Sequence, residues 1–264
     1  MSLANGLDDM WRVFSASATG KRNLDAGAVG QDASHCVVTD ELLVAVVCDG
    51  AGSAREGRAG AGFTARALAE QLARDVAADR DGPAEDRAQD GGRRELAIRR
   101  AIETVRSRLA DLAASHELAL HDYSCTLVGC VAAREGGCFF HVGDGFAIQQ
   151  GPAGDTVLSR PENGEYADET YFVTDENWLE HLRFTALALP QRGAVIGLMS
   201  DGTAPFAVNR ARSGFFRPFI DPITSFLHAA TASNGNEALR SLLESPRACE
   251  ISADDKTLLL AFVL

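Results

Sequence analysis

Short apolar segments, too brief for typical helices and rich in β-branched residues, are the feature that most constrains how this chain can fold. They span 33–38, 42–48, 126–132, 138–142, 146–149, 195–199 and 257–264. Runs of this length and composition, bounded by turn residues, are typical of buried strands. An aspartate stands at or near one end of five of them: Asp32, Asp49, Asp144, Asp201 and Asp254. If the strands share one sheet system, their ends bring these carboxylates together.

Helical periodicity is confined to a few stretches. Leu68, Leu72 and Val76 recur every fourth residue, and a second apolar stripe runs through 93–115. A late helical stretch lies around 236–243. The order of one strand, two helices and then mainly strands differs from the strict alternation of a doubly wound fold. The pattern therefore predicts an α+β sandwich of sheets and helices.

Charge and composition exclude several classes of function. The 264 residues include 25 Lys and Arg against 37 Asp and Glu, a formal charge of −12, which argues against binding to nucleic acid or to anionic membranes. No apolar run is long enough to span a bilayer, and residues 1–10 lack the pattern of a signal peptide. The six cysteines form no C-x-x-C pair and are expected to be reduced thiols. We therefore expect a cytoplasmic protein with neither a nucleic-acid nor a membrane partner.

The aspartates have two interpretations. Asp49, Asp144 and Asp201 each precede a glycine, and Asp-Gly is a common turn dipeptide. Alternatively, the carboxylates form a metal site. Carboxylates brought side by side raise one another's pKa and burial adds a desolvation cost, and a divalent cation removes both problems. Ligation by oxygen alone suits hard ions such as Mg²⁺ or Mn²⁺. The pattern by itself leaves both interpretations open.

Six motifs follow one another along the chain. They are GQDA at 30–33, VAVVCDGAGSAREGRAGA at 44–61, SCTL at 124–127, HVGDG at 141–145, LMSDG at 198–202 and DDKTLLL at 254–260. In this order they resemble the metal-dependent serine/threonine protein phosphatases of the 2C type, and they cover nearly the whole chain. The segment GEYADETYFVT at 164–174 is similar to the flap of a bacterial branch of that family.

The resemblance implies both a fold and an activity. The fold would be a single domain over 1–264 with four layers, α-β-β-α: two antiparallel sheets flanked by helices, a metal site between the sheets, and a flap or insert at about 160–190. The activity would be hydrolysis of phosphoserine and phosphothreonine in proteins by a water that bridges two Mn²⁺ or Mg²⁺ ions, without a covalent intermediate. A third, weaker ion site would use Asp144. The partner would be a phosphoprotein, either a kinase or a kinase target.

The same resemblance assigns roles to the remaining motif residues. Asp49 would bridge both ions, and the carbonyl of Gly50 would bind one of them. Asp201 and Asp254 would complete the shell of the other ion, and Asp32 would act through water. Asp49 and Asp201 would thus serve catalysis through the metal-bound water.

Two positions depart from the family's pattern. Ala51 stands where eukaryotic members usually have the histidine that is thought to protonate the leaving group. Gly27 stands five residues before Asp32, where an arginine often holds the substrate phosphate. Lys21 and Arg22 are the nearest basic residues for that role, with solvated surface charges as the alternative.

The region around the expected flap is acidic. Residues 155–180 contain eight acidic residues and one arginine. This balance predicts a preference for basic phosphopeptides if the segment borders the site. The alternative is a solvated surface loop with no role in recognition.

Other phosphate chemistries do not fit the residues. Cys48 and Arg55 miss the spacing of a cysteine-dependent phosphatase by one position, and Gly20-Lys21 lacks the rest of a P-loop. Two alternatives stay open beside a protein phosphatase. One is a catalytically weak or inactive module of the same fold that binds a kinase or phosphoprotein, and the other is an enzyme that hydrolyses a small phosphoester.

Overall fold

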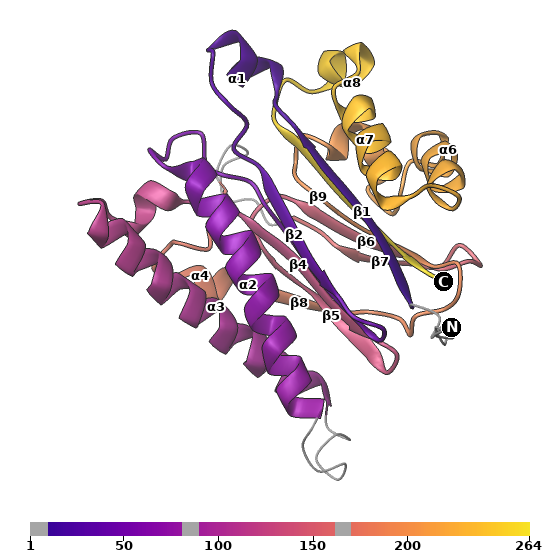
Figure 1. The fold of residues 1–264 in the computed structure, drawn as a ribbon, viewed down its shortest axis with the longest axis horizontal. Helices are drawn as coiled ribbons and strands as arrows, with labels where there is room; N and C mark the ends of the chain where they lie inside the picture. The colour runs from indigo at the N-terminus through magenta and orange to yellow at the C-terminus, as the bar shows by residue number, and fades with distance from the viewer. Residues whose placement is uncertain (1–9, 81–89, 162–169) are drawn as a thin grey trace, which may run out of the picture.

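Two five-stranded sheets stack face to face between two groups of helices (Figure 1). The computed structural model describes residues 10–80, 90–161 and 170–264. The first sheet has the strand order β1-β10-β9-β6-β7 and the second β2-β3-β4-β5-β8. Every pairing between neighbouring strands is antiparallel. The predicted α+β sandwich with four layers is therefore confirmed.

The strands agree closely with the apolar segments of the sequence. The first sheet contains β1 (Trp11–Ala18), β10 (Lys256–Val263), β9 (Val195–Met199), β6 (Phe146–Gln150) and β7 (Thr156–Ser159). The second contains β2 (Ala33–Val38), β3 (Leu42–Cys48), β4 (Leu127–Ala133), β5 (Gly136–Val142) and β8 (Arg183–Ala186). All seven predicted strands are present, and β1, β7 and β8 are additional.

The helices cover the two outer faces of the sandwich (Figure 1). Helices α2 (Gly57–Arg80) and α3 (Asp90–Ser115) lie on the second sheet, whereas α6 (Arg217–Leu227), α7 (Ala232–Leu243) and α8 (Pro246–Ile251) lie on the first. The short elements are α1 (Lys21–Asp25), the 3₁₀ helix η2 (Leu120–Tyr123), α4 (Trp178–His181) and α5 (Ala204–Ala207). The predicted helical stretches fall within α2, α3 and α7. Among the described residues, no helix has the length and apolarity needed to cross a membrane.

Strand β3 shows why this chain builds two stacked sheets. All seven of its residues are buried. Leu43, Ala45 and Val47 belong to the apolar layer between the sheets, whereas Val44 and Val46 pack toward α2 and α3. A strand buried on both faces is a continuous apolar run instead of an alternating one. Four of the six free cysteines are buried within these layers.

Candidate metal centre

One pocket gathers most of the aspartates that the sequence singled out. It has a volume of about 550 Å³, and its lining includes Asp49, Gly50, Asp144, Asp201 and Asp254, together with Arg22 from α1. Asp32 lies beside these residues, where its Oδ2 accepts a hydrogen bond from the Ser200 hydroxyl at 2.6 Å. Lys21 is not part of the lining, and its ammonium group pairs with Asp25 on the surface at 2.5 Å.

The glycines that follow three of the aspartates are required by close packing and not by turn geometry. Gly50, Gly145 and Gly202 are all outside the left-handed region of φ that Asp-Gly hairpin turns use. A Cβ atom on Gly50 would lie 2.5 Å from the carbonyl oxygen of Gly57. A Cβ atom on Gly202 would lie 2.0 Å from the carbonyl oxygen of Asp255. This geometry favours a built site over a set of ordinary turns.

Three carboxyl groups of this cluster share a buried, negatively charged environment. Burial raises the pKa of Asp32 to about 7, with a smaller contribution from Asp255. Burial also raises the pKa of Asp201 to about 6, assisted by Asp144 and Asp254. For Asp49, burial followed by the charges of Asp32 and Asp201 raises the pKa well above its usual range. The cluster therefore retains protons that isolated aspartates release near pH 4.

Two carboxylate oxygen atoms of the cluster have no hydrogen-bond partner within the described residues. They are Asp32 Oδ1 and Asp201 Oδ1, and both are buried. A hydrogen bond between the Asp49 carboxyl group and that of Asp32 or Asp201 requires a proton on one member of the pair. Across residues 10–80, 90–161 and 170–264, no three His, Cys, Asp or Glu side chains are grouped to hold an ion as they stand. Binding would thus require loss of the shared proton and side-chain adjustment, and the all-oxygen set suits Mg²⁺ or Mn²⁺.

Two threonines form hydrogen bonds with acidic residues of the pocket. The Thr126 hydroxyl accepts a hydrogen bond from the Asp49 N–H at 3.1 Å, and the Thr126 N–H donates to the Asp49 carbonyl at 2.8 Å. The Thr170 hydroxyl donates to the Asp144 carboxylate at 2.6 Å. Thr170 belongs to the predicted flap at 160–190, of which 162–169 lie outside the described residues. The following part of that segment returns to the sandwich as α4 and β8, which pairs with β5.

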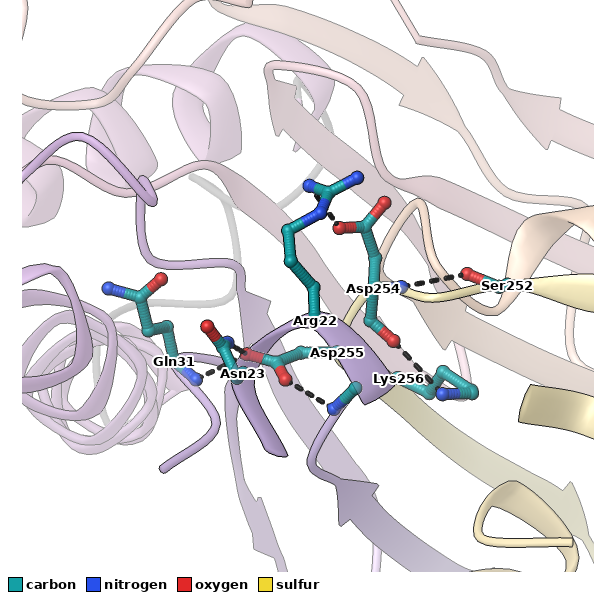
Figure 2. A network of polar contacts seen from close by, with 8 residues as sticks. Arg22, Asn23, Gln31, Ser252, Asp254, Asp255 and Lys256 are labelled. Carbon is teal, nitrogen blue, oxygen red and sulfur yellow. Dashed lines mark hydrogen bonds and ion pairs between the residues drawn. The ribbon is translucent and has the colours of Figure 1, made fainter. Parts of the chain in front are cut away.

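The turn before β10 is joined to α1 by polar contacts, as Figure 2 shows, and Arg22 and Asn23 of α1 line the pocket. Arg22 Nη1 pairs with Asp254 Oδ1 at 2.8 Å. The Asp255 carboxylate accepts three hydrogen bonds: from the Gly20 N–H at 2.6 Å, the Asn23 side-chain amide at 2.8 Å and the Gln31 N–H at 2.6 Å. The polar network therefore connects α1 with the residues next to a predicted metal ligand.

Sequence reasoning missed three residues of the site. Asp255 immediately follows Asp254, so the Asp-Asp pair was a visible signal for a second acidic residue. Thr126 lies within the SCTL motif, although the motif does not reveal its contact with Asp49. Nothing in the sequence marks Thr170 as a partner of Asp144.

Comparison with known proteins identifies the family. Residues 19–244 match the family model described as protein phosphatase 2C. The chain belongs to the protein phosphatase 2C family. Serine/threonine-protein phosphatase 3 of Escherichia coli (strain K12) is 30% identical to it over 260 residues, which cover 95% of this chain and 98% of that protein. The predicted membership of this phosphatase family is confirmed.

Solved structures share the fold of this 2C-family phosphatase along almost its whole length. A bacterial serine phosphatase superimposes with a TM-score of 0.63 at 16% identity, covering 96% of this chain and 97% of that chain. PppA, described as a key regulatory component of T6SS in Pseudomonas aeruginosa, gives 0.60 at 19% identity, with 96% and 98% covered. RsbX in complex with magnesium gives 0.55 at 13% identity, with 96% of each chain covered. At these identities the likeness concerns the fold.

Proposed function

We propose that this 2C-family phosphatase hydrolyses phosphoserine and phosphothreonine in proteins, with Mn²⁺ or Mg²⁺ held by the aspartate pocket. The observation that carries the proposal is the placement of Asp32, Asp49 and Asp201: buried carboxyl groups side by side, two of them with an oxygen that no donor faces. Such an arrangement is costly without a cation. A divalent ion supplies the missing positive charge.

The proposed ligands come from both sheets. Asp49 interacts with Asp32 and Asp201, so it would be the ligand shared by two ions. The further ligands would be Asp32, the Gly50 carbonyl, Asp201 and Asp254, and Asp144 would serve a third ion. When bound, the ions supply a water of lowered pKa as the nucleophile and neutralise phosphate charge.

No side chain in the described lining is arranged as a nucleophile. The lining contains the hydroxyl groups of Ser53, Thr126 and Thr170 but neither cysteine nor histidine. Thr126 and Thr170 are already hydrogen-bonded to Asp49 and Asp144. We therefore propose direct attack by water, without a covalent intermediate. Because Ala51 also lines the pocket, the leaving group would take its proton from solvent.

Arg22 is the cation that we propose for the substrate phosphate. It lines the pocket, and its pairing with Asp254 uses Nη1. The guanidinium group carries five N–H donors in a plane, so donors remain for phosphate oxygens. Lys21 points to Asp25 instead. The substrate would be a phosphoprotein made by a serine/threonine kinase, either the kinase itself or its target.

Phosphate release from a phosphothreonine peptide, with and without Mn²⁺, tests this function. We compare the native protein with Asp49→Asn and with Asp221→Asn, a matched surface control whose carboxylate pairs with Arg217 on α6. We expect metal-dependent turnover in the native protein and the control, and a roughly hundredfold or larger loss in Asp49→Asn.

Two other outcomes would refute the proposed function. No turnover by native protein that binds Mn²⁺ in calorimetry would favour an inactive module that binds a kinase or phosphoprotein. Hydrolysis of a small phosphoester without hydrolysis of the peptide would assign a different substrate class.

A further inference from the structure

We infer that Asp255 is a positioning residue for phosphate recognition: it holds α1 at the pocket so that Arg22 can reach the substrate phosphate. The inference rests on the proposed function and extends it to a residue that contacts neither metal nor substrate in that proposal. It is carried by the hydrogen bonds of the buried Asp255 carboxylate and by the way α1 sits on the fold.

Helix α1 has no hydrophobic attachment of its own. It is five residues long, and none of its residues is buried. A helix this short is not stable by itself in water, and without a buried face it gains nothing from packing. Polar contacts must therefore determine where α1 and its Arg22 side chain lie.

Asp255 supplies those contacts on both sides of α1. Its carboxylate accepts hydrogen bonds from Gly20 before the helix, from Asn23 within it and from Gln31 beyond it. Asp255 is only 7% exposed, and hydrogen bonds to a charged acceptor are stronger than neutral ones. An ionised carboxylate is an acceptor only. The three N–H donors that converge on Asp255 therefore suit an ionised carboxylate. An asparagine at this position would turn its own N–H₂ group toward one of those donors.

The backbone brings the two segments into direct contact. The Arg22 N–H donates to the Ala253 carbonyl at 3.0 Å. A Cβ atom on Gly20 would lie 2.3 Å from the carbonyl carbon of Asp254, so only glycine allows this approach. The Asp254 carbonyl in turn accepts a hydrogen bond from the fully buried Lys256 at 3.0 Å. The turn is thus a fixed support for α1 (Figure 2).

The position of the Arg22 side chain depends on these contacts between α1 and the turn. Its side chain is 74% exposed and pairs with Asp254 through Nη1, so its remaining N–H groups are accessible from the pocket. A planar guanidinium matches phosphate oxygens only when it is correctly oriented. Loosening α1 should therefore weaken phosphate binding while leaving the aspartate cluster in place.

The experiment measures three quantities on the Mn²⁺-loaded protein: kcat and KM for a phosphothreonine peptide, the Kd for inorganic phosphate by calorimetry, and the Mn²⁺ affinity. Asp255→Asn and Asn23→Ala are the test variants, and the second removes one amide from an exposed helix, so it does not threaten folding. We expect KM and the phosphate Kd to rise by roughly 3–10-fold in each, with kcat unchanged in both variants and Mn²⁺ affinity unchanged in Asn23→Ala, which alters no charge near the aspartates. Lys21→Ala, the matched control on the same helix, should match the native protein.

A double variant separates positioning from a general structural effect. Arg22→Ala should raise KM and the phosphate Kd by roughly 10-fold or more. Adding Asp255→Asn to Arg22→Ala should change neither value further, because Asp255 acts through Arg22.

The inference is overturned if Asp255→Asn and Asn23→Ala keep native values, or if Asp255→Asn has the same effect with and without Arg22. Metal-dependent turnover of the native protein would leave the proposed function intact in either case. If the native protein shows no turnover, the phosphate Kd still tests the role of Asp255.

Discussion

Replacing Asp49 with asparagine should stabilise the metal-free protein at alkaline pH, although it removes a proposed metal ligand. Asp49 interacts with Asp32 and Asp201, and burial raises the pKa of all three carboxyl groups. The folded, metal-free protein therefore binds more protons than the unfolded chain. Its stability is retained below the unfolded pKa, near 4, and is lost as the pH rises through the folded pKa values.

The magnitude follows from the Asp32 carboxyl group. Its pKa rises from 3.8 to about 7, which corresponds to about 4 kcal/mol of lost stability above pH 7. An asparagine side chain at position 49 is neutral at every pH and can donate its amide to Asp32. The substitution removes the Asp49 carboxyl group, whose pKa is raised by burial and by the charges of Asp32 and Asp201, but it leaves Asp32 buried. We therefore expect Asp49→Asn to gain about 1–3 kcal/mol at pH 8. The gain should vanish near pH 4, where native Asp49 is protonated.

Thermal unfolding followed by circular dichroism measures this difference. Native protein, Asp49→Asn and the control Asp221→Asn are compared in EDTA at about pH 8 and about pH 4.5; for a chain of this size 1 kcal/mol shifts Tm by about 2–4 °C. Mn²⁺ should raise the Tm of the native protein more than that of Asp49→Asn. A lower Tm for Asp49→Asn at pH 8, or the same difference at both pH values, would refute the reasoning.

Three further predictions concern other parts of the molecule. Burial and then Arg183 lower the pKa of His141 to about 3. The contribution of His141 to the free energy of unfolding should therefore decrease as the pH falls below about 6.5, by up to about 1.4 kcal/mol per pH unit and opposite in sign to that of the aspartates. In unfolding experiments, His141→Gln should become more stable relative to the native protein as the pH falls from about 6.5 to about 4. Gly202→Ala should lower the free energy of unfolding by about 3 kcal/mol or more, because the added Cβ meets backbone atoms. Gly62→Ala in α2, where a Cβ would have nothing within 4 Å, should raise it by about 0.5–1 kcal/mol. Similar Tm values for the two variants would contradict the packing argument. Finally, the acidic residues of 155–180 should make a basic phosphopeptide a better substrate than an acidic one at low salt, and equal rates would remove this idea.

Most strands that the sequence predicted are buried, continuous apolar runs, with the half-buried β2 as an exception, and the three that it missed are partly exposed. Strand β1 alternates buried Phe14, Ala16 and Ala18 with the serines between them, so it has the period of two but no continuous apolar run. Strand β8 lies at the edge of the second sheet, and none of its four residues is buried. Edge strands of this length carry little hydrophobic signal, and only pairing with β5 reveals β8.

The site could be predicted where each residue belongs to a local motif. The Asp-Gly pairs at the ends of β3 and β9 were visible, and the structure brings Asp49 and Asp201 into one pocket. The role of Asp255 was not visible because its partners Gly20 and Gln31 are more than 200 positions away in the sequence. The sequence alone does not distinguish an aspartate that accepts several hydrogen bonds from distant segments from an aspartate on the surface.

The positions of the proposed ligands in the two sheets explain how the fold tolerates such a cluster. Asp49 follows β3 and Asp144 follows β5, both in the second sheet, whereas Asp201 follows β9 and Asp254 precedes β10 in the first. The pocket therefore exists only while the two sheets are stacked, and the apolar layer between them opposes the repulsion of the carboxylates. A cation bound there would join the sheets directly. Metal binding and sheet stacking should consequently stabilise each other, since each brings together the groups that the other requires.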